Sequence, residues 1–246
     1  MAEKLADLAQ RIFRDGGCVI SLAGADGDCR RFWEAGPGTG RADAAPAMLA
    51  VPEPVRRNEG FIVPSDVCFA ALGWDRRLAG VSFTGAWLTA ARVLSYDYLW
   101  NEVRVKGGAY GVGFKAMRKG GMRFYSYRDP HRDETLERFA QASEWLAGFE
   151  PSAEDMEGFV VATVAGLDAP NKPRSLVRKQ GLEFFTGCTE ETRLRIRSEA
   201  AGATLDGIRT VAPMIERIAE ERALCVFGNR GILENAKEEL DLIELI

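Results

Sequence analysis

Apolar residues recur at helical spacing before the middle of the chain and predict a buried helix. They are Trp87, Ala91, Leu94 and Tyr98, with Thr84 as a candidate cap. Arg104 and Lys106 fall in the last turn, where cations suit the negative end of a helix dipole. Gly107 and Gly108 can supply the left-handed backbone that ends a helix. Tyr110 then opens a strand, so a tight turn can aim the side chains of Arg104 and Tyr110 at one point.

Alternating apolar and polar residues follow this turn. Residues 110–117 and 122–128 predict two strands of a hairpin, joined across residues 118–121. Asp129-Pro130 breaks the second strand, and a helix follows. Its predicted inner positions recur at helical spacing and are Leu136, Phe139, Ala140, Ser143 and Leu146.

The remaining pattern predicts further helices and strands around this centre. Helices are expected over 2–14, 26–33, from Ser152 onward, over 174–185, 190–201 and 204–221, and from about 232 to the end; Pro213 should divide the helix over 204–221. Strands are expected over 18–22, within 60–73 and over 223–227, and a long connection over 36–54. Hairpins and helices without a strict βαβ rhythm indicate an α+β fold.

Composition narrows the classes of function. A chain of 246 residues with 46% apolar and 28% charged residues is an ordinary globule. Its net charge of −4 argues against a nucleic-acid partner. No apolar run is long enough to cross a bilayer and no signal peptide begins the chain, so we expect a cytoplasmic protein without a membrane partner. The five cysteines lack metal-site spacing and read as reduced core residues.

Three segments carry a resemblance to a known family: Glu102-Val-Arg104 through Lys106-Gly-Gly-Ala-Tyr110-Gly111, Phe124-Tyr-Ser-Tyr-Arg-Asp-Pro130 and Glu134-Thr-Leu136. Together they resemble the C-terminal domain of the presequence-protease branch of the pitrilysin/insulinase zinc metallopeptidases. The resemblance covers residues 83–139 closely and continues loosely to the C-terminus, while the first fifty residues carry little of it.

The resemblance implies a two-layer sandwich, a mainly antiparallel sheet with helices packed on one face. Residues 1–246 would form a single C-terminal domain without zinc, of which 1–54 could include a linker from the preceding domain. Zinc would lie in an N-terminal partner half, in the same chain or a separate subunit. Arg104 and Tyr110 would bind the backbone of a peptide substrate near that zinc, and Gly107 and Gly108 would form the supporting turn. No catalytic residue and no cofactor are expected within this chain.

Other kinds of site and other classes of function have to be weighed against this interpretation. The family's zinc motif is H-x-x-E-H, and the chain's one histidine stands in His131-Arg-Asp-Glu134-Thr135, with threonine in place of the second ligand. The glycines from Gly107 to Gly113 follow a helix and precede a strand, the reverse of a phosphate-binding loop. Asp97 and Glu102 are candidate acids beside the site. The main competing interpretation is a stand-alone peptide-binding or scaffold subunit without peptidase activity.

Overall fold

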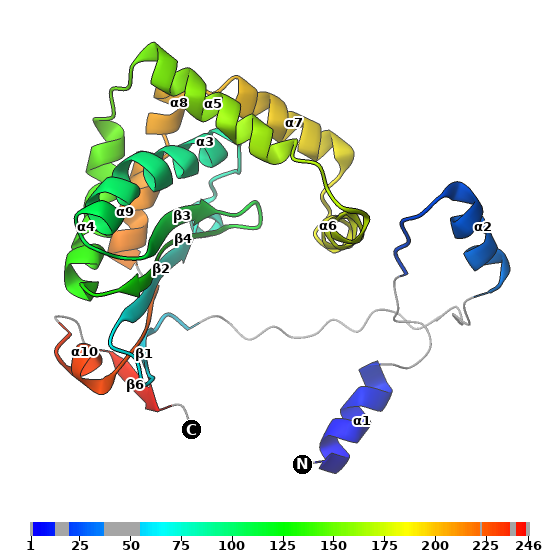
Figure 1. Cartoon of the computed structure of the whole chain (residues 1–246), viewed down its shortest axis with the longest axis horizontal. Helices are drawn as coiled ribbons and strands as arrows, with labels where there is room; N and C mark the ends of the chain where they lie inside the picture. Colours follow the sequence, from blue (N-terminus) through cyan, green and yellow to red (C-terminus); the bar gives the residue numbers. More distant parts are fainter. Residues whose placement is uncertain (1, 13–19, 37–54, 222, 237–239, 245–246) are drawn as a thin grey trace. The chain divides into compact units, whose positions relative to one another are not determined.

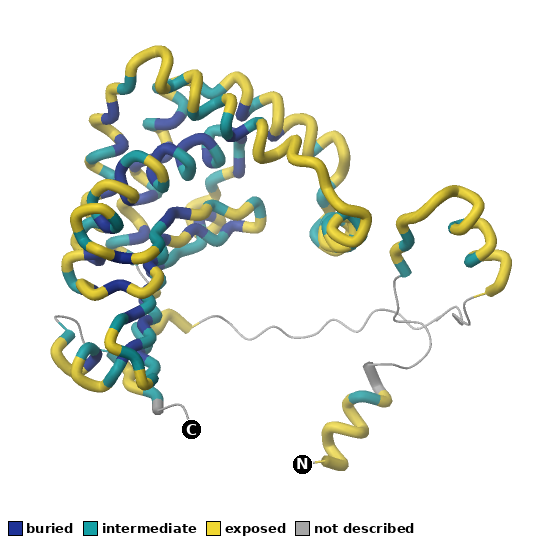
Figure 2. The backbone as a smooth tube through the Cα atoms, viewed as in Figure 1, coloured by how far each residue is buried: buried dark blue, intermediate teal, exposed yellow. Residues whose placement is uncertain are grey.

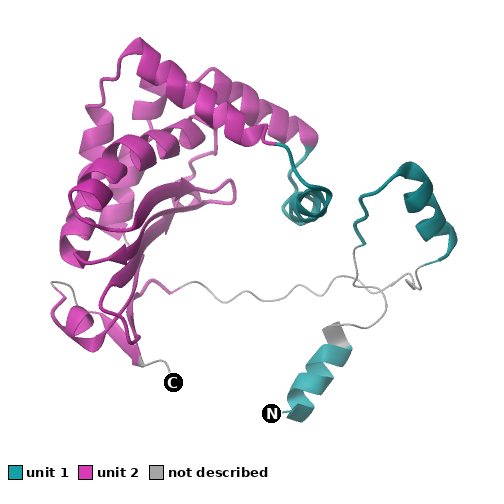
Figure 3. Ribbon diagram, in the orientation of Figure 1, with its two compact units in different colours: residues 1–53, 170–189 teal, residues 54–169, 190–246 magenta. Residues whose placement is uncertain are grey.

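The computed structural model describes residues 2–12, 20–36, 55–221, 223–236 and 240–244. They divide into two compact units, one of residues 1–53 with 170–189 and one of residues 54–169 with 190–246 (Figure 3). The first unit contains helices α1 (Ala2–Ile12), α2 (Asp26–Glu34) and α6 (Pro173–Phe185). No side chain that the structure describes on these three helices is buried (Figure 2).

The second unit is built on a six-stranded sheet in the order β3-β4-β2-β5-β1-β6 (Figure 1). The strands are β1 (Asn58–Ile62), β2 (Cys68–Asp75), β3 (Gly111–Ala116), β4 (Gly121–Asp129), β5 (Ala223–Gly228) and β6 (Asp241–Glu244). Three neighbouring pairs, β3 with β4, β4 with β2 and β2 with β5, are antiparallel. β1 runs parallel to both β5 and β6. The sheet is therefore mixed, with antiparallel pairing in its first four strands.

Helices cover one face of this sheet. The helices that contact strands are α3 (Gly85–Val93), the π-helix η2 (Leu94–Val105), α4 (Arg132–Ala147), α9 (Ala212–Glu221) and α10 (Arg230–Glu234). Three more, α5 (Ala153–Leu167), α7 (Glu190–Ala201) and α8 (Leu205–Arg209), pack on other helices, and the short 3-10 turn η1 (Arg76–Ala79) follows β2. α3, α4 and α9 contact β3, β4 and β2 (Figure 1). The α+β fold with a helical layer is the one that the sequence predicts.

The core lies between the sheet and these helices. Leu72 of β2 stands opposite Phe124 of β4 and Leu224 of β5, and all three side chains are almost fully buried. The Phe124 ring stacks on Phe139 of α4 with centroids 4.9 Å apart. The inner face of α4 differs from the prediction at one position, because Ala140 is exposed and Ala142 is buried.

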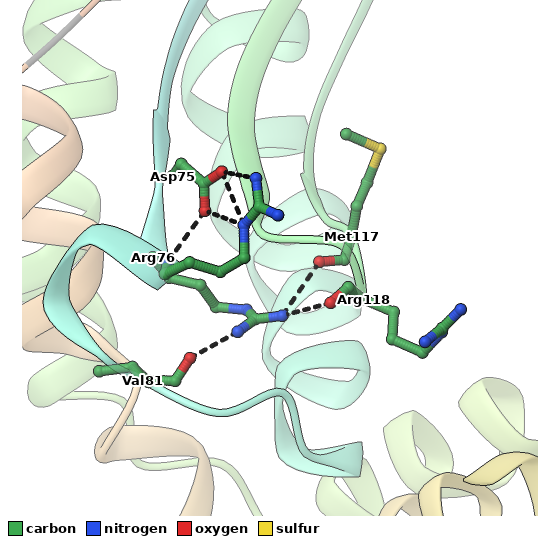
Figure 4. Close-up of polar contacts among 6 residues, drawn as sticks. Asp75, Arg76, Val81, Met117 and Arg118 are labelled. Carbon is green, nitrogen blue, oxygen red and sulfur yellow. Dashed lines mark hydrogen bonds and ion pairs between the residues drawn. The ribbon is translucent and has the colours of Figure 1, made fainter. Parts of the chain in front are cut away.

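A buried arginine ties the hairpin turn to the end of β2. The Arg76 guanidinium donates to the carbonyls of Val81, Met117 and Arg118 (Figure 4). Beside it, the Asp75 carboxylate accepts from the backbone and guanidinium of Arg77, and this hydrogen bonding lowers the pKa of Asp75. Arg76 thereby ties the turn of the hairpin between β3 and β4 to the end of β2.

Three details of the sequence-based prediction are wrong. Thr84 precedes α3, but its side chain makes no cap hydrogen bond, and the Glu199 carboxylate accepts from the Gly85 N–H at 2.8 Å. The expected final helix stops at Glu234, and the chain returns as strand β6 beside β1. Residues 20–22 form no strand, and Cys18 and Val19 lie outside the described residues, as do residues 37–54 of the expected connection. Pro213 does divide its helix, into α8 and α9.

Candidate functional site

The site begins where α3 continues into η2. The Lys106 N–H donates to the Asn101 carbonyl five residues earlier at 3.0 Å, which is π-helical spacing. Tyr98 anchors this segment, since it is 5% exposed and its hydroxyl donates to the Arg138 carbonyl at 2.8 Å. Burial, followed by the nearby charge of Glu102, raises the pKa of Tyr98 to about 12. Tyr98 is thus a neutral packing residue at physiological pH.

The two glycines after η2 are needed for different reasons. A Cβ on Gly107 would lie 2.6 Å from the Val103 carbonyl oxygen, so only glycine fits this close approach. Gly108 has φ of +77°, the left-handed conformation that ends a helix. The Tyr110 N–H then donates to the Arg128 carbonyl at 3.3 Å, which joins the chain to the end of β4. The turn therefore reverses the chain within a few residues.

This turn brings Arg104 and Tyr110 together. The Arg104 guanidinium carbon lies 6.0 Å from the centroid of the Tyr110 ring and 3.9 Å from that of Trp100. Tyr110 is 67% exposed, and Arg104 is half-buried. Within the described part of the chain, neither the guanidinium nor the Tyr110 hydroxyl has a hydrogen-bond or ion-pair partner. Both groups thus keep their donors available to a ligand.

Aromatic residues extend from this point across the sheet face opposite the helices. The ring of Tyr127 lies 5.8 Å from Tyr110 and 5.2 Å from Phe69. Phe69 stands opposite Phe227, whose ring stacks on Phe61 at 4.7 Å. The sequence alone does not indicate this row of rings, because the row depends on which strands pair. Trp100 was also missed, although its position four residues before Arg104 on a helix could have indicated a stacked pair.

The two candidate acids have other neighbours. Glu102 pairs with Lys106 at 2.5 Å and with Arg138 at 3.4 Å. The Asp97 carboxyl lies near Asp155 of α5, and burial followed by that like charge raises its pKa. Glu102 therefore ties η2 to α4 through Arg138, whereas Asp97 faces a like charge.

No metal centre is formed by the residues that the structure describes. They contain no group of three or more histidine, cysteine, aspartate or glutamate side chains that could hold an ion. His131 immediately precedes α4, and its N–H donates to the Asp129 carboxylate at 2.9 Å. The four described cysteines, Cys29, Cys68, Cys188 and Cys225, are free thiols.

Comparison with known proteins then assigns the chain to a family. Residues 58–226 match the family model described as the PreP C-terminal domain. The chain belongs to the PreP C-terminal domain family. The match includes the whole segment from α3 through the glycine turn to α4, and with it Arg104 and Tyr110.

Relatives of this PreP C-terminal domain are much longer proteins. Protein HypA of Clostridium perfringens is 34% identical over 191 residues, 78% of this chain and 19% of that protein. Presequence protease 1, chloroplastic/mitochondrial, of Arabidopsis thaliana is 25% identical over 185 residues, 74% of this chain and 17% of that protein. The chain thus spans about a fifth of the length of these relatives.

Solved structures show the same fold. A peptidase M16 inactive domain from Pseudomonas fluorescens aligns with a TM-score of 0.56 and 15% identity, over 89% of this chain and 53% of that one. A conserved protein from Enterococcus faecalis aligns with a TM-score of 0.59 and 15% identity, over 93% of this chain and 56% of that one. In addition, no helix among the described residues is long and apolar enough to cross a membrane.

Proposed function

We propose that the chain is the non-catalytic C-terminal domain of a zinc metalloendopeptidase that degrades unstructured peptides. In this proposal it forms part of a chamber wall, and a zinc site on an N-terminal half cleaves the peptide. The relatives named presequence protease support the reaction class. The length of these relatives, of which this domain covers about a fifth, supports a partner half.

One observation carries the role of this domain, namely that Arg104 and Tyr110 lie side by side with unengaged donors. A guanidinium offers fixed donors to a peptide carbonyl, and a phenol adds one more. Donors held in place before reaction stabilise the negative charge that develops on that carbonyl oxygen. The pair would therefore bind the substrate backbone next to the scissile bond.

The test is kinetic and uses the peptidase assembled with its zinc-bearing half. Arg104→Ala and Tyr110→Phe should each lower kcat/KM by roughly ten- to a thousandfold, the range for one lost transition-state donor. Arg174→Ala, which removes an exposed arginine on α6, should leave kcat/KM unchanged. Equal activity of the wild type and both site variants would refute the role of the pair. It would leave a structural role for Arg104 and Tyr110.

A further inference from the structure

A second polar site lies beside the Arg104–Tyr110 pair, along strand β3. It is a pocket of about 310 Å³ between the α3–η2 segment and strands β3 and β4. Its ten lining residues include two cations, Arg92 and Lys115, and four aromatic residues, Tyr96, Trp100, Phe114 and Tyr125, but no acid. This composition is that of a site for an anion.

The cations of this pocket stack on rings and lack acidic partners. The Arg92 guanidinium carbon lies 5.3 Å from the Tyr96 ring centroid, and the Lys115 ammonium lies 5.2 Å from that of Tyr125. Neither cation has an ion pair within the described ranges. Lys115 also stands directly opposite Arg123 on β4, a like-charge pair that is unfavourable until an anion neutralises it.

A glycine gives the pocket its hydroxyl group. An ideal Cβ on Gly113 would lie 2.7 Å from the Tyr125 hydroxyl oxygen, so the Tyr125 ring passes over β3 only because residue 113 has no side chain. In the part of the chain that the structure describes, this hydroxyl has no hydrogen-bond partner. The pocket thus presents an ammonium, a guanidinium and a phenol that together can surround one carboxylate.

We propose that this pocket binds a carboxylate of the peptide substrate, either a side chain or the C-terminal group. The proposal rests on the proposed function, and it adds recognition of a carboxylate to the backbone contacts of Arg104 and Tyr110. Trp100 connects the two sites, because it lines the pocket and also stacks on Arg104.

Binding of three ten-residue peptides to the full chain tests this pocket. They share one flexible sequence: one has a central glutamate and an amidated C-terminus, one has glutamine and an amidated C-terminus, and one has glutamine and a free C-terminal carboxylate. Titration calorimetry should show at least one carboxylate peptide binding about tenfold more tightly than the neutral peptide. The peptide whose affinity exceeds that of the neutral one shows whether the pocket binds a side-chain carboxylate or the C-terminal one.

Variants of the pocket residues test whether the gain, meaning the higher affinity for a carboxylate peptide than for the neutral one, arises in this pocket. The double variant Arg92→Gln/Lys115→Met should bind all three peptides equally, and Tyr125→Phe, which keeps the ring, should reduce the gain. Lys115→Arg and the hairpin-turn control Lys119→Met should preserve it. Equal binding of all three peptides to the wild type, or a gain that survives the double variant, overturns the carboxylate site.

Arg104→Ala separates the two proposals, since it should weaken the binding of the neutral peptide as much as the binding of the other two. Suppose that Arg104→Ala leaves the affinity for the neutral peptide unchanged and the gain persists. The backbone role of Arg104 is then refuted, and the carboxylate site stands. If none of the peptides binds, both proposals are overturned.

Discussion

Trp100 holds Arg104 in place without using its hydrogen bonds. The guanidinium lies over the indole at 3.9 Å, so the attraction acts through the face of the planar group. Its five N–H donors point outward in that plane and remain free for a carbonyl or carboxylate. A salt bridge would have fixed the same side chain but would have consumed the donors that a peptide needs.

Asp97 gives a pH-dependent prediction at this scale. Its pKa in the folded protein is raised by burial and by Asp155, so its contribution to stability is fully present below the unfolded pKa and is lost as the pH rises through the folded one. Asp97→Asn should therefore stabilise the protein at pH 7 and have little effect below about pH 3.5, beneath the unfolded pKa. Urea unfolding at both pH values measures the difference. Equal effects at both pH values would show that Asp97 is not strained in the fold.

The sequence predicts that the glycine turn brings Arg104 and Tyr110 together, because local spacing and the family resemblance both concern neighbouring positions, and the structure has this geometry. Their role in binding a peptide stays a prediction. The sequence could not predict Tyr127 or Tyr125 beside them. Their positions depend on the register of β4 against β3, in which Tyr127 faces Gly111 and Tyr125 faces Gly113. The chemistry of the site is therefore partly local in sequence and partly a product of strand pairing.

Among the elements, η2 departs most from its expected geometry. The sequence predicts one continuous helix, and the chain forms an α-helix that widens into a π-helix at Leu94. Apolar periodicity does not distinguish the two over a few turns, and π-helical segments are frequent at functional sites. The widening carries Trp100 and Arg104, so it sets the position of the proposed backbone contacts.

The contact between α3 and α7 gives a prediction at the element scale. A Cβ on Gly85 would lie 2.1 Å from the Ala200 backbone nitrogen, and backbone cannot move aside as a side chain can. Gly85→Ala should therefore lower the free energy of unfolding by about 2–3 kcal/mol. Denaturant unfolding measures this change.

Gly158 is the matched control for this substitution. It lies within α5 and has no atom within 4 Å of its would-be Cβ. Gly158→Ala should stabilise the protein by about 0.5–1 kcal/mol through helix propensity alone. If both variants were stabilised alike, the close approach of α3 and α7 would be refuted.

For the whole sheet, the sequence predicts the fold class and most of the strands, but it does not predict how the strands pair. Alternation over 110–117 and 122–128 predicted β3 and β4, and the strands expected within 60–73 and over 223–227 correspond to β1, β2 and β5. The segment of β6 was instead included in a final helix expected from about Ile232. Parallel pairing of β1 with β5 and β6 joins segments more than 160 residues apart, and nothing local in the sequence specifies such contacts. Tertiary contacts decided these pairings.

At the scale of the whole chain we predict that residues 1–54 contribute little to stability. The described side chains of α1 and α2 are not buried, so removing them costs little hydrophobic free energy. A protein beginning at Val55 should melt within about 2 °C of the full chain, by circular dichroism. Phe139→Ala, which empties a fully buried position, should lower Tm by about 10 °C in the same assay. A comparable loss on truncation would show that the first 54 residues belong to the cooperative fold.

Strand β3 is an edge of the sheet, yet part of its edge is already occupied. The Ser95 hydroxyl accepts from the Phe114 N–H at 2.9 Å and donates to the Phe114 carbonyl at 3.2 Å. These two backbone groups would otherwise be open to an added strand. At Phe114 this one side chain blocks edge-to-edge aggregation between copies of the domain. It also prevents a peptide from extending the sheet at Phe114, so any peptide on this edge would be held there by side chains of the domain.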